Sequence, residues 1–227
     1  MAKKNKQADV SNNTHECCEE KIALNRQDNI ALKDILSSPD KINMIWDFYV
    51  SHAPIKKNPE EKANGFGYRC LASFGWGGSA DLSALERELI KSAGLGHFVM
   101  IKADEITETL NNMNLNDKIC WKHPRAVLKQ SYTFKVHENG KIDITNSESR
   151  MVCLFRHIRN SLAHNRIYLS QDRTMILLED AEDGGRLSAR ILIPVRSLVD
   201  WIEIVDKNKN FYFKPQDETT GVISYPA

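Results

Sequence analysis

The 227-residue chain lacks several features that would assign it to a special class of proteins. It has no run of about 18 apolar residues, so we expect no membrane-spanning helix and no membrane partner. Its first residues, MAKKNKQADVSNN, contain no apolar segment of the kind that marks a secretory signal. The net charge at pH 7 is only +1, which argues against a protein that coats nucleic acid with its whole surface. Any contact with RNA must therefore come from a local basic patch.

Cysteines are few and form no familiar metal or disulfide pattern. The five cysteines contain no CxxC pair; they are Cys17, Cys18, Cys70, Cys120 and Cys153. Such an odd, scattered set fits reduced thiols in the cytoplasm better than a disulfide framework or a zinc site. The segment His15-Glu16-Cys17-Cys18 suggests a metal site, but adjacent cysteines on a helix point apart and no second pair follows. We predict a cytoplasmic protein with no metal and no other cofactor.

Familiar catalytic motifs are also missing. The sequence contains no G-x-S-x-G, no H-E-x-x-H and no Walker box. The glycine- and aromatic-rich segment at residues 65–78, GFGYRCLASFGWGG, is not a phosphate-binding loop because no Gly-Lys-Ser/Thr follows it. Aromatic rings interleaved with Arg69 could stack unpaired bases. Turns combined with core aromatics are the more common explanation of such a segment.

The stretch from Met151 to Tyr168, MVCLFRHIRNSLAHNRIY, organises the chain and has the period of one amphipathic helix. Its apolar stripe comprises Met151, Leu154, Phe155, Ile158 and Leu162. Its other face is basic and comprises Arg156, His157, Arg159, Asn160 and His164. Because the stripe must pack on a core, we predict that the basic face points toward solvent, a ligand or a second subunit. A basic face that is merely solvated is the alternative.

The basic face carries the residue types that metal-independent cleavage of RNA requires. A histidine suits acid–base work because its unperturbed pKa lies near physiological pH. An arginine offers a planar, always charged, bidentate donor to a phosphate. We predict His164, Arg159 and Asn160 as the catalytic residues, with Asn160 holding the histidine tautomer or donating to the phosphate. The predicted additional RNA- and phosphate-binding residues are Arg156, His157 and Arg166.

The spacing of the two charged residues predicts a dimer. Arg159 and His164 are five residues apart and diverge by about 140° around a helix. On a single helix the two side chains point too far apart to reach one phosphate easily, whereas two copies related by a two-fold axis could bring them together. The sequence does not show where the dimer contact lies, although the N-terminal helices could supply it.

The segment Arg159-Asn160-Ser161-Leu162-Ala163-His164 resembles the R-x(4–6)-H motif of HEPN domains, in its RN-x-x-x-H form. The wider FRHIRNSLAHNRIY resembles a plasmid- and defence-associated branch, and the likeness is sharpest over residues 147–207. The resemblance implies a small helical bundle and a dimeric, metal-independent endoribonuclease that leaves a 2′,3′-cyclic phosphate. It also implies a toxin restrained by an antitoxin, or an antiviral defence effector under regulation. The alternative is a non-catalytic HEPN-like module that binds nucleotides, RNA or proteins.

The remaining periodicities predict an α+β chain, mostly α, with a HEPN-like helical bundle and β-hairpin additions. We expect helices at residues 30–36, 39–49, 81–94, 104–114, within 121–130, and at 197–205. We expect strands at residues 132–136, 142–144, 166–169, 174–179 and 187–193, the first two joined through Asn139-Gly140. Ser147 is the expected cap of the central helix. We predict a flexible tail at 1–13, a single domain at 14–209 and a C-terminal tail at 210–227.

Overall fold

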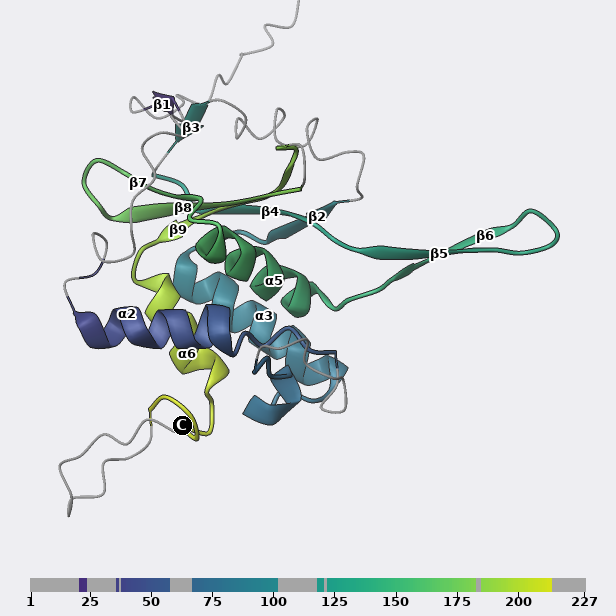
Figure 1. Ribbon diagram of the computed structural model, residues 1–227, viewed down its shortest axis with the longest axis horizontal. Coiled ribbons are helices and arrows are strands. Elements are labelled where there is room, and N and C mark those ends of the chain that lie inside the picture. Colours follow the sequence, from purple (N-terminus) through teal and green to yellow (C-terminus); the bar gives the residue numbers. More distant parts are fainter. Residues whose placement is uncertain are drawn as a thin grey trace, which may run out of the picture.

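A computed structural model describes residues 21–23, 36, 38–57, 67–101, 118–120, 122–182 and 185–213. A mixed five-stranded sheet lies at its centre, with helices against one face (Figure 1). In spatial order the strands are β2 (Phe98–Ile101), β4 (Arg125–Lys129), β9 (Leu187–Pro194), β8 (Met175–Ala181) and β7 (Ile167–Leu169). Strands β2 and β4 are parallel, and every other neighbouring pair is antiparallel. A separate short ladder pairs β1 (Lys21–Ala23) with β3 (Lys118–Cys120).

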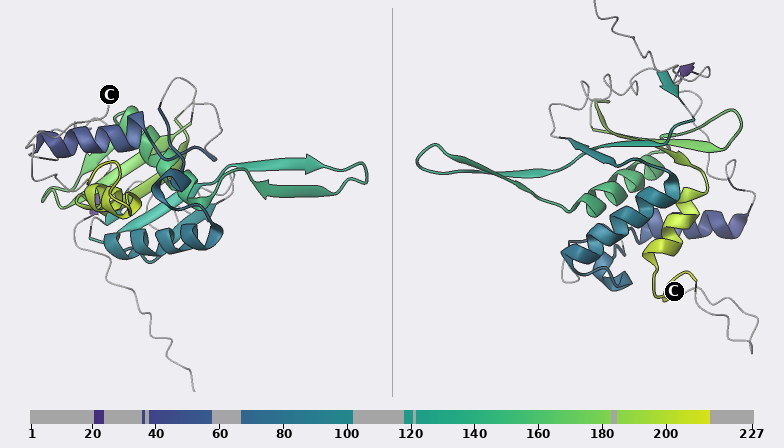
Figure 2. Two further views of the ribbon diagram at one scale, coloured as in Figure 1. Left: turned by 90° about the horizontal axis from the view of Figure 1, so that it is seen from below. Right: turned by 180° about the vertical axis from the view of Figure 1, so that it is seen from behind.

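The helices cover the sheet in two levels, which the views in Figures 1 and 2 show from different sides. Helix α5 (Arg150–Ala163) packs directly against β8, β4 and β9. Farther out lie α3 (Ser79–Ala93) and α2 (Pro39–Trp46), both in contact with α6 (Ser197–Val205). Two short turns complete this layer, η2 (Asp47–Ser51) and η3 (Leu71–Phe74). In the described part of the chain, no helix is long and apolar enough to cross a membrane.

Both faces of the sheet are buried. Ile176, Leu178 and Ile191 belong to the large core under the helices. The alternate residues Leu177 and Leu192 belong to a second cluster on the opposite face. Successive strand residues point to opposite faces, so this arrangement requires an apolar residue at nearly every position. The strands are therefore the centre of the domain.

This α/β architecture shows that the prediction of a mostly helical, HEPN-like bundle is wrong. The segments that form β7, β8 and β9 were predicted as strands, but as additions to a bundle. An added hairpin needs only one apolar face, whereas β8 and β9 are buried on both. The predicted helix within residues 121–130 is wrong as well, because Ala126, Val127 and Leu128 form the middle of β4.

Other predicted elements agree with the structure or lie outside it. The helix over residues 197–205 is confirmed as α6, and Gly94 ends α3 in the left-handed conformation with φ of 67°. The helix predicted at 39–49 corresponds to α2, with Pro39 in its first turn, and to the following turn η2. The helix predicted at 104–114, most of the one at 30–36 and the tail at 1–13 lie outside the described residues.

Helix α5 begins and ends at residues that the sequence pattern did not identify. Ser149, not Ser147, is its cap: the Ser149 hydroxyl accepts a hydrogen bond from the Val152 amide at 3.2 Å. The predicted apolar stripe is confirmed, since all five of its side chains are buried. The helix stops at Ala163 because Asn165 adopts a left-handed conformation with φ of 52°, which turns the chain into β7. The prediction that the helix continues to Tyr168 is therefore wrong.

The hairpin of β5 (Tyr132–Val136) and β6 (Ile142–Asn146) is confirmed and projects from the body as an arm (Figures 1 and 2). We call residues 132–146 the arm. Its turn contains Gly140, whose φ of 78° suits a residue without a side chain. One face of the arm is apolar and exposed, with the cross-strand pairs Phe134–Ile144 and Val136–Ile142. The other face pairs Lys135 with Asp143 and is polar.

Candidate functional site

One residue on the predicted basic face of α5, His157, is buried. His157 has an exposed fraction of 0%, so it does not face bulk solvent, and its predicted role in binding RNA stays a prediction. Its Nδ1 lies 2.7 Å from an Asp180 carboxylate oxygen, and its Nε2 lies 2.8 Å from the Lys129 carbonyl oxygen. An ionised carboxylate only accepts hydrogen bonds, so Nδ1 carries a hydrogen and donates it to Asp180. His157 is thus held between Asp180 on one side and, on the other, the Lys129 carbonyl and Arg156 Nη2, which lies 3.3 Å from Nε2.

Arg156 is committed to a second buried acid. Its Nη2 and Nε lie 2.6 and 2.9 Å from the two carboxylate oxygens of Glu148, and Nη2 also donates to the Lys129 carbonyl at 3.1 Å. Burial alone would raise the pKa of Glu148, but the hydrogen bonds and charge of Arg156 hold that pKa below its ordinary value. Arg156, predicted to bind phosphate, therefore already has a carboxylate in the bidentate geometry that a phosphate would take.

The predicted catalytic residues Arg159 and Asn160 are joined side chain to side chain. Arg159 donates from Nη1 to the Asn160 amide oxygen at 3.1 Å. Asn160 in turn donates from its amide nitrogen to Asp180 at 3.0 Å. Burial would raise the pKa of Asp180, but its bonds to His157 and Asn160 lower it, so the carboxylate stays ionised. The Arg159–Asn160 pair is thereby tied to the buried Asp180–His157 pair.

The third predicted catalytic residue lies apart from this chain of bonds. His164 follows the last residue of α5 and is exposed, and its backbone amide donates to the Asn160 carbonyl at 3.0 Å. Its imidazole makes no hydrogen bond to any described residue. The Arg159 guanidinium lies 5.8 Å from the centre of the Tyr68 ring. The structure thus brings Arg159 and Asn160 together, and leaves His164 on the surface beyond the end of the helix.

Arg166 is half-buried and stabilises the turn that follows α5. Its Nη1 donates to the Ala181 carbonyl at the end of β8, at 2.9 Å. This bond fixes the exposed turn that carries His164 to the sheet. Of the three predicted RNA-binding residues, Arg166 and Arg156 are partly exposed and His157 is not.

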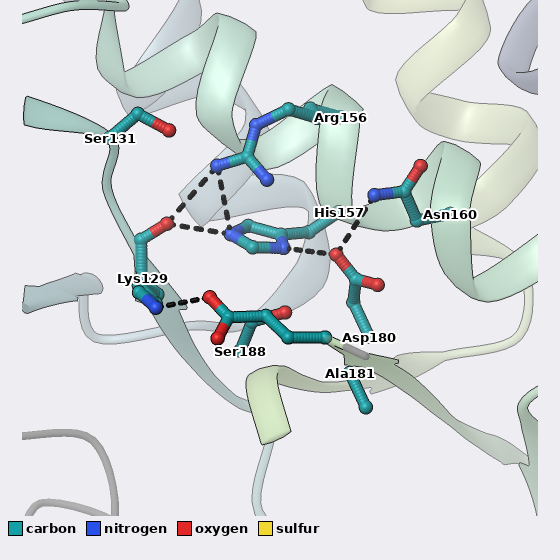
Figure 3. A pocket seen from close by; sticks show the side chains of 9 residues that line it. Lys129, Ser131, Arg156, His157, Asn160, Asp180, Ala181 and Ser188 are labelled. Carbon is teal, nitrogen blue, oxygen red and sulfur yellow. Dashed lines mark hydrogen bonds and ion pairs between the residues drawn. The ribbon is translucent and has the colours of Figure 1, made fainter. Parts of the chain in front are cut away.

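An open pocket of about 150 Å³ lies between α5 and the ends of β4 and β8 (Figure 3). Its lining residues are Lys129, Ser131, Arg156, His157, Asn160, Asp180, Ala181, Glu182 and Ser188. Figure 3 shows the His157 ring in the middle of the group, between the Lys129 carbonyl and Asp180. The Lys129 ammonium forms an ion pair with Glu182. Each cation in the pocket wall therefore faces a carboxylate.

Sequence reasoning missed the acids of this site: Asp180, Glu148 and Glu182. One signal was available for Asp180, because an acid in a strand as apolar as MILLEDA must be paired if it is buried. The adjacent Glu179 obeys the same rule on the other face of the sheet, where it pairs with the buried Arg190 at 2.6 Å. The identity of the partners could not be read, since Asp180 is 23 residues from His157 along the chain.

The segment at residues 67–78 contributes mainly to the core. Phe74 and Trp76 are 1% and 3% exposed, which confirms the interpretation as turns with core aromatics for these two rings. Arg69 donates to the Tyr212 hydroxyl at 2.9 Å and lies 4.4 Å from the centre of the Phe211 ring. These contacts attach the chain beyond α6 to the body.

Within the described ranges, no group of three or more His, Cys, Asp or Glu side chains is placed to hold a metal ion. Cys70 and Cys153 are buried free thiols, and burial raises the pKa of Cys153. Compared with protein-family models, with curated proteins and with solved structures, the chain matches none of them.

Proposed function

We propose that this protein is a metal-independent endoribonuclease whose catalytic residues are Arg159, Asn160 and His164. One observation supports this most strongly. Arg159 and Asn160 are hydrogen-bonded to each other and anchored through Asp180, and His164 lies exposed one turn farther along. A buried ion pair that holds an arginine and an asparagine at the surface is the preorganisation that a phosphate site needs.

The reaction proposed at this site is an in-line attack within the RNA. A neutral His164 takes the proton of a ribose 2′-hydroxyl, and the 2′-oxygen forms a bond to the adjacent phosphorus. The bond from phosphorus to the 5′-oxygen breaks, and that oxygen takes a proton from a histidinium. The products are a 2′,3′-cyclic phosphate and a 5′-hydroxyl. Arg159 neutralises the charge that builds on the phosphate oxygens.

A homodimer is part of the proposal, because the two proton transfers need a base and an acid. One His164 per chain can serve as only one of them at a time. A two-fold axis near the end of α5 would supply the second histidine from the other copy. The dimer would also let the Arg159 of one chain reach the phosphate held by the His164 of the other.

The resemblance to HEPN ribonucleases rests on the sequence motif and not on the fold. The sheet-centred architecture adds no support for that link, so the proposal depends on the residues and their geometry. A toxin or antiviral defence effector in the cytoplasm, restrained by an antitoxin or another regulatory protein, is the setting we propose. Buried free thiols at Cys70 and Cys153 are consistent with a reducing compartment.

A protein-binding module without catalysis is the second candidate, and the exposed apolar face of the arm favours it. One experiment separates the two. Labelled RNA is incubated with the purified protein in EDTA, beside His164→Ala and the control His97→Ala, which alters another exposed histidine. We expect cyclic phosphate ends with the native protein and the control, and none with His164→Ala. Activity that depends strictly on added Mg²⁺ or Mn²⁺, or full activity in His164→Ala, would contradict the mechanism, and the absence of cleavage by the native protein would favour the binding module.

A further inference from the structure

The pocket beside Asn160 is polar but balanced in charge. Its two permanent cations face carboxylates in the pairs Lys129–Glu182 and Arg156–Glu148, and the third carboxylate, Asp180, is bonded to His157. A bare phosphate would find every cation already neutralised and would be repelled by the acids. A neutral ligand with both donors and acceptors is the better match, because it can bond to the pairs without breaking them.

Several groups at the rim can still bond to such a ligand. The Glu182 side chain is 37% exposed, and its two oxygens have lone pairs beyond those used by Lys129 and Arg186. The Lys129 ammonium has three donor hydrogens, and Glu182 takes one of them. The Arg156 side chain is 28% exposed, and its Nη1 makes no hydrogen bond to a described residue. The two carboxylate oxygens of Glu182, which accept hydrogen bonds, thus lie next to the Lys129 ammonium and the Arg156 guanidinium, which donate them.

The position of the pocket relates it to the proposed phosphate site. Asn160 lines the pocket and, through its amide oxygen, holds Arg159. A nucleotide with its phosphate at Arg159 would therefore have its base within reach of the pocket.

From these observations we propose that the pocket is a base-binding subsite for guanine, so that RNA is cut next to a guanosine. The proposal rests on the ribonuclease function proposed above. Guanine alone among the RNA bases has two adjacent donors on its Watson–Crick edge, N1–H and N2–H, and the carboxylate of Glu182 can accept both. The neighbouring guanine O6 is an acceptor for Lys129 or Arg156. Adenine, cytosine and uracil each place an acceptor where the carboxylate needs a donor.

Binding of mononucleotides tests the subsite without any need for catalysis. Calorimetry of the full chain with guanosine, adenosine, cytidine and inosine 5′-monophosphates should give roughly tenfold or more tighter binding of the guanosine nucleotide than of the adenosine or cytidine nucleotide. Inosine lacks the N2 amine and should be intermediate. Glu182→Gln should remove the difference, since an amide cannot accept two hydrogen bonds side by side. The matched control is Glu138→Gln in the exposed turn of the arm, which should retain it.

Cleavage supplies the second readout and separates the two proposals. RNAs with a single guanosine, or with adenosine or inosine in its place, should be cut within one nucleotide of the guanosine, with a preference that Glu182→Gln reduces roughly tenfold or more. Cleavage without base preference, together with equal binding of all nucleotides, would contradict the guanine subsite but not the proposed ribonuclease function. Preferential binding of the guanosine nucleotide without cleavage would retain the subsite and remove the ribonuclease. A guanine preference that survives in a folded Glu182→Gln protein would also overturn the subsite.

Discussion

Replacing Asp180 with asparagine tests the buried ion pair on which the site is built. The Asp180 side chain is 6% exposed and His157 is fully buried, so the substitution removes the carboxylate that pairs with the buried imidazole. Loss of one partner of such a pair costs about 3–5 kcal/mol. For a chain of this size, about 3 kcal/mol corresponds to a melting temperature lowered by roughly 6–12 °C.

The pH dependence of this effect has a definite sign. The pKa of Asp180 is lowered in the folded protein, so its contribution is present above the ordinary aspartate pKa of about 4 and is lost as pH falls toward the lower folded value. Chemical denaturation followed by tryptophan fluorescence should therefore show that the difference in unfolding free energy between native and Asp180→Asn proteins shrinks as pH falls below about 4.

Asp143→Asn on the arm is the matched control. Asp143 also pairs with a histidine, His137 at 2.6 Å, but its side chain is 41% exposed. That substitution should change the free energy of unfolding by less than about 1 kcal/mol. A cost at pH 7 below about 1 kcal/mol for Asp180→Asn, or a difference that does not shrink below about pH 4, would refute the assignment of Asp180 as an ionised carboxylate that holds the buried His157.

Further predictions concern the helix, the dimer and the buried thiol. Ile158→Ala should destabilise the protein by about 2–5 kcal/mol in denaturant titrations, because Ile158 is fully buried in the core. His164→Ala should change stability by less than about 1 kcal/mol, since His164 is exposed, while abolishing RNA cleavage; a large stability loss would mean that His164 is structural. Light scattering should show a dimer at micromolar concentration, and a monomer that still cuts RNA would rule out a composite site. Mixing inactive Arg159→Ala and His164→Ala chains should restore some cleavage if one intact pair suffices. Cys153 should resist alkylation at pH 8 in the folded protein, because burial keeps its thiol protonated, and fast labelling would contradict its placement.

Local patterns predicted the individual elements well, and the global arrangement poorly. The 3.6-residue period identified the stripe of α5, and the alternation around Asn139-Gly140 identified the arm, because both depend on neighbours in sequence. Whether strands are added to a helical bundle or form the centre of the domain depends on pairing between segments that are far apart in the chain. The pairing of β4 with β9 places Val127 opposite Arg190, and no local sequence pattern predicts that contact.

The candidate site shows the same division. The spacing of Arg159, Asn160 and His164 could be read directly, but their environment could not. The adjacent residues Arg156 and His157 both look like members of a basic face, yet Arg156 is partly exposed and His157 is enclosed. The difference arises from Asp180 and the Lys129 carbonyl, which approach from two strands and bond to the enclosed His157 ring.

The arm has a consequence for handling the protein at high concentration. A two-stranded ribbon has two edges whose backbone groups can pair with another strand, and Phe134, Val136, Ile142 and Ile144 give this one an exposed apolar face. Ribbons of this kind are only marginally stable in water and open readily. Lys135 and Lys141, on the strand and in the turn, are the charges that oppose strand-to-strand association. Aggregation should therefore begin at the arm, accelerate when salt screens these charges, and slow when Phe134 and Ile144 are both replaced by threonine, while the sheet-centred body remains folded.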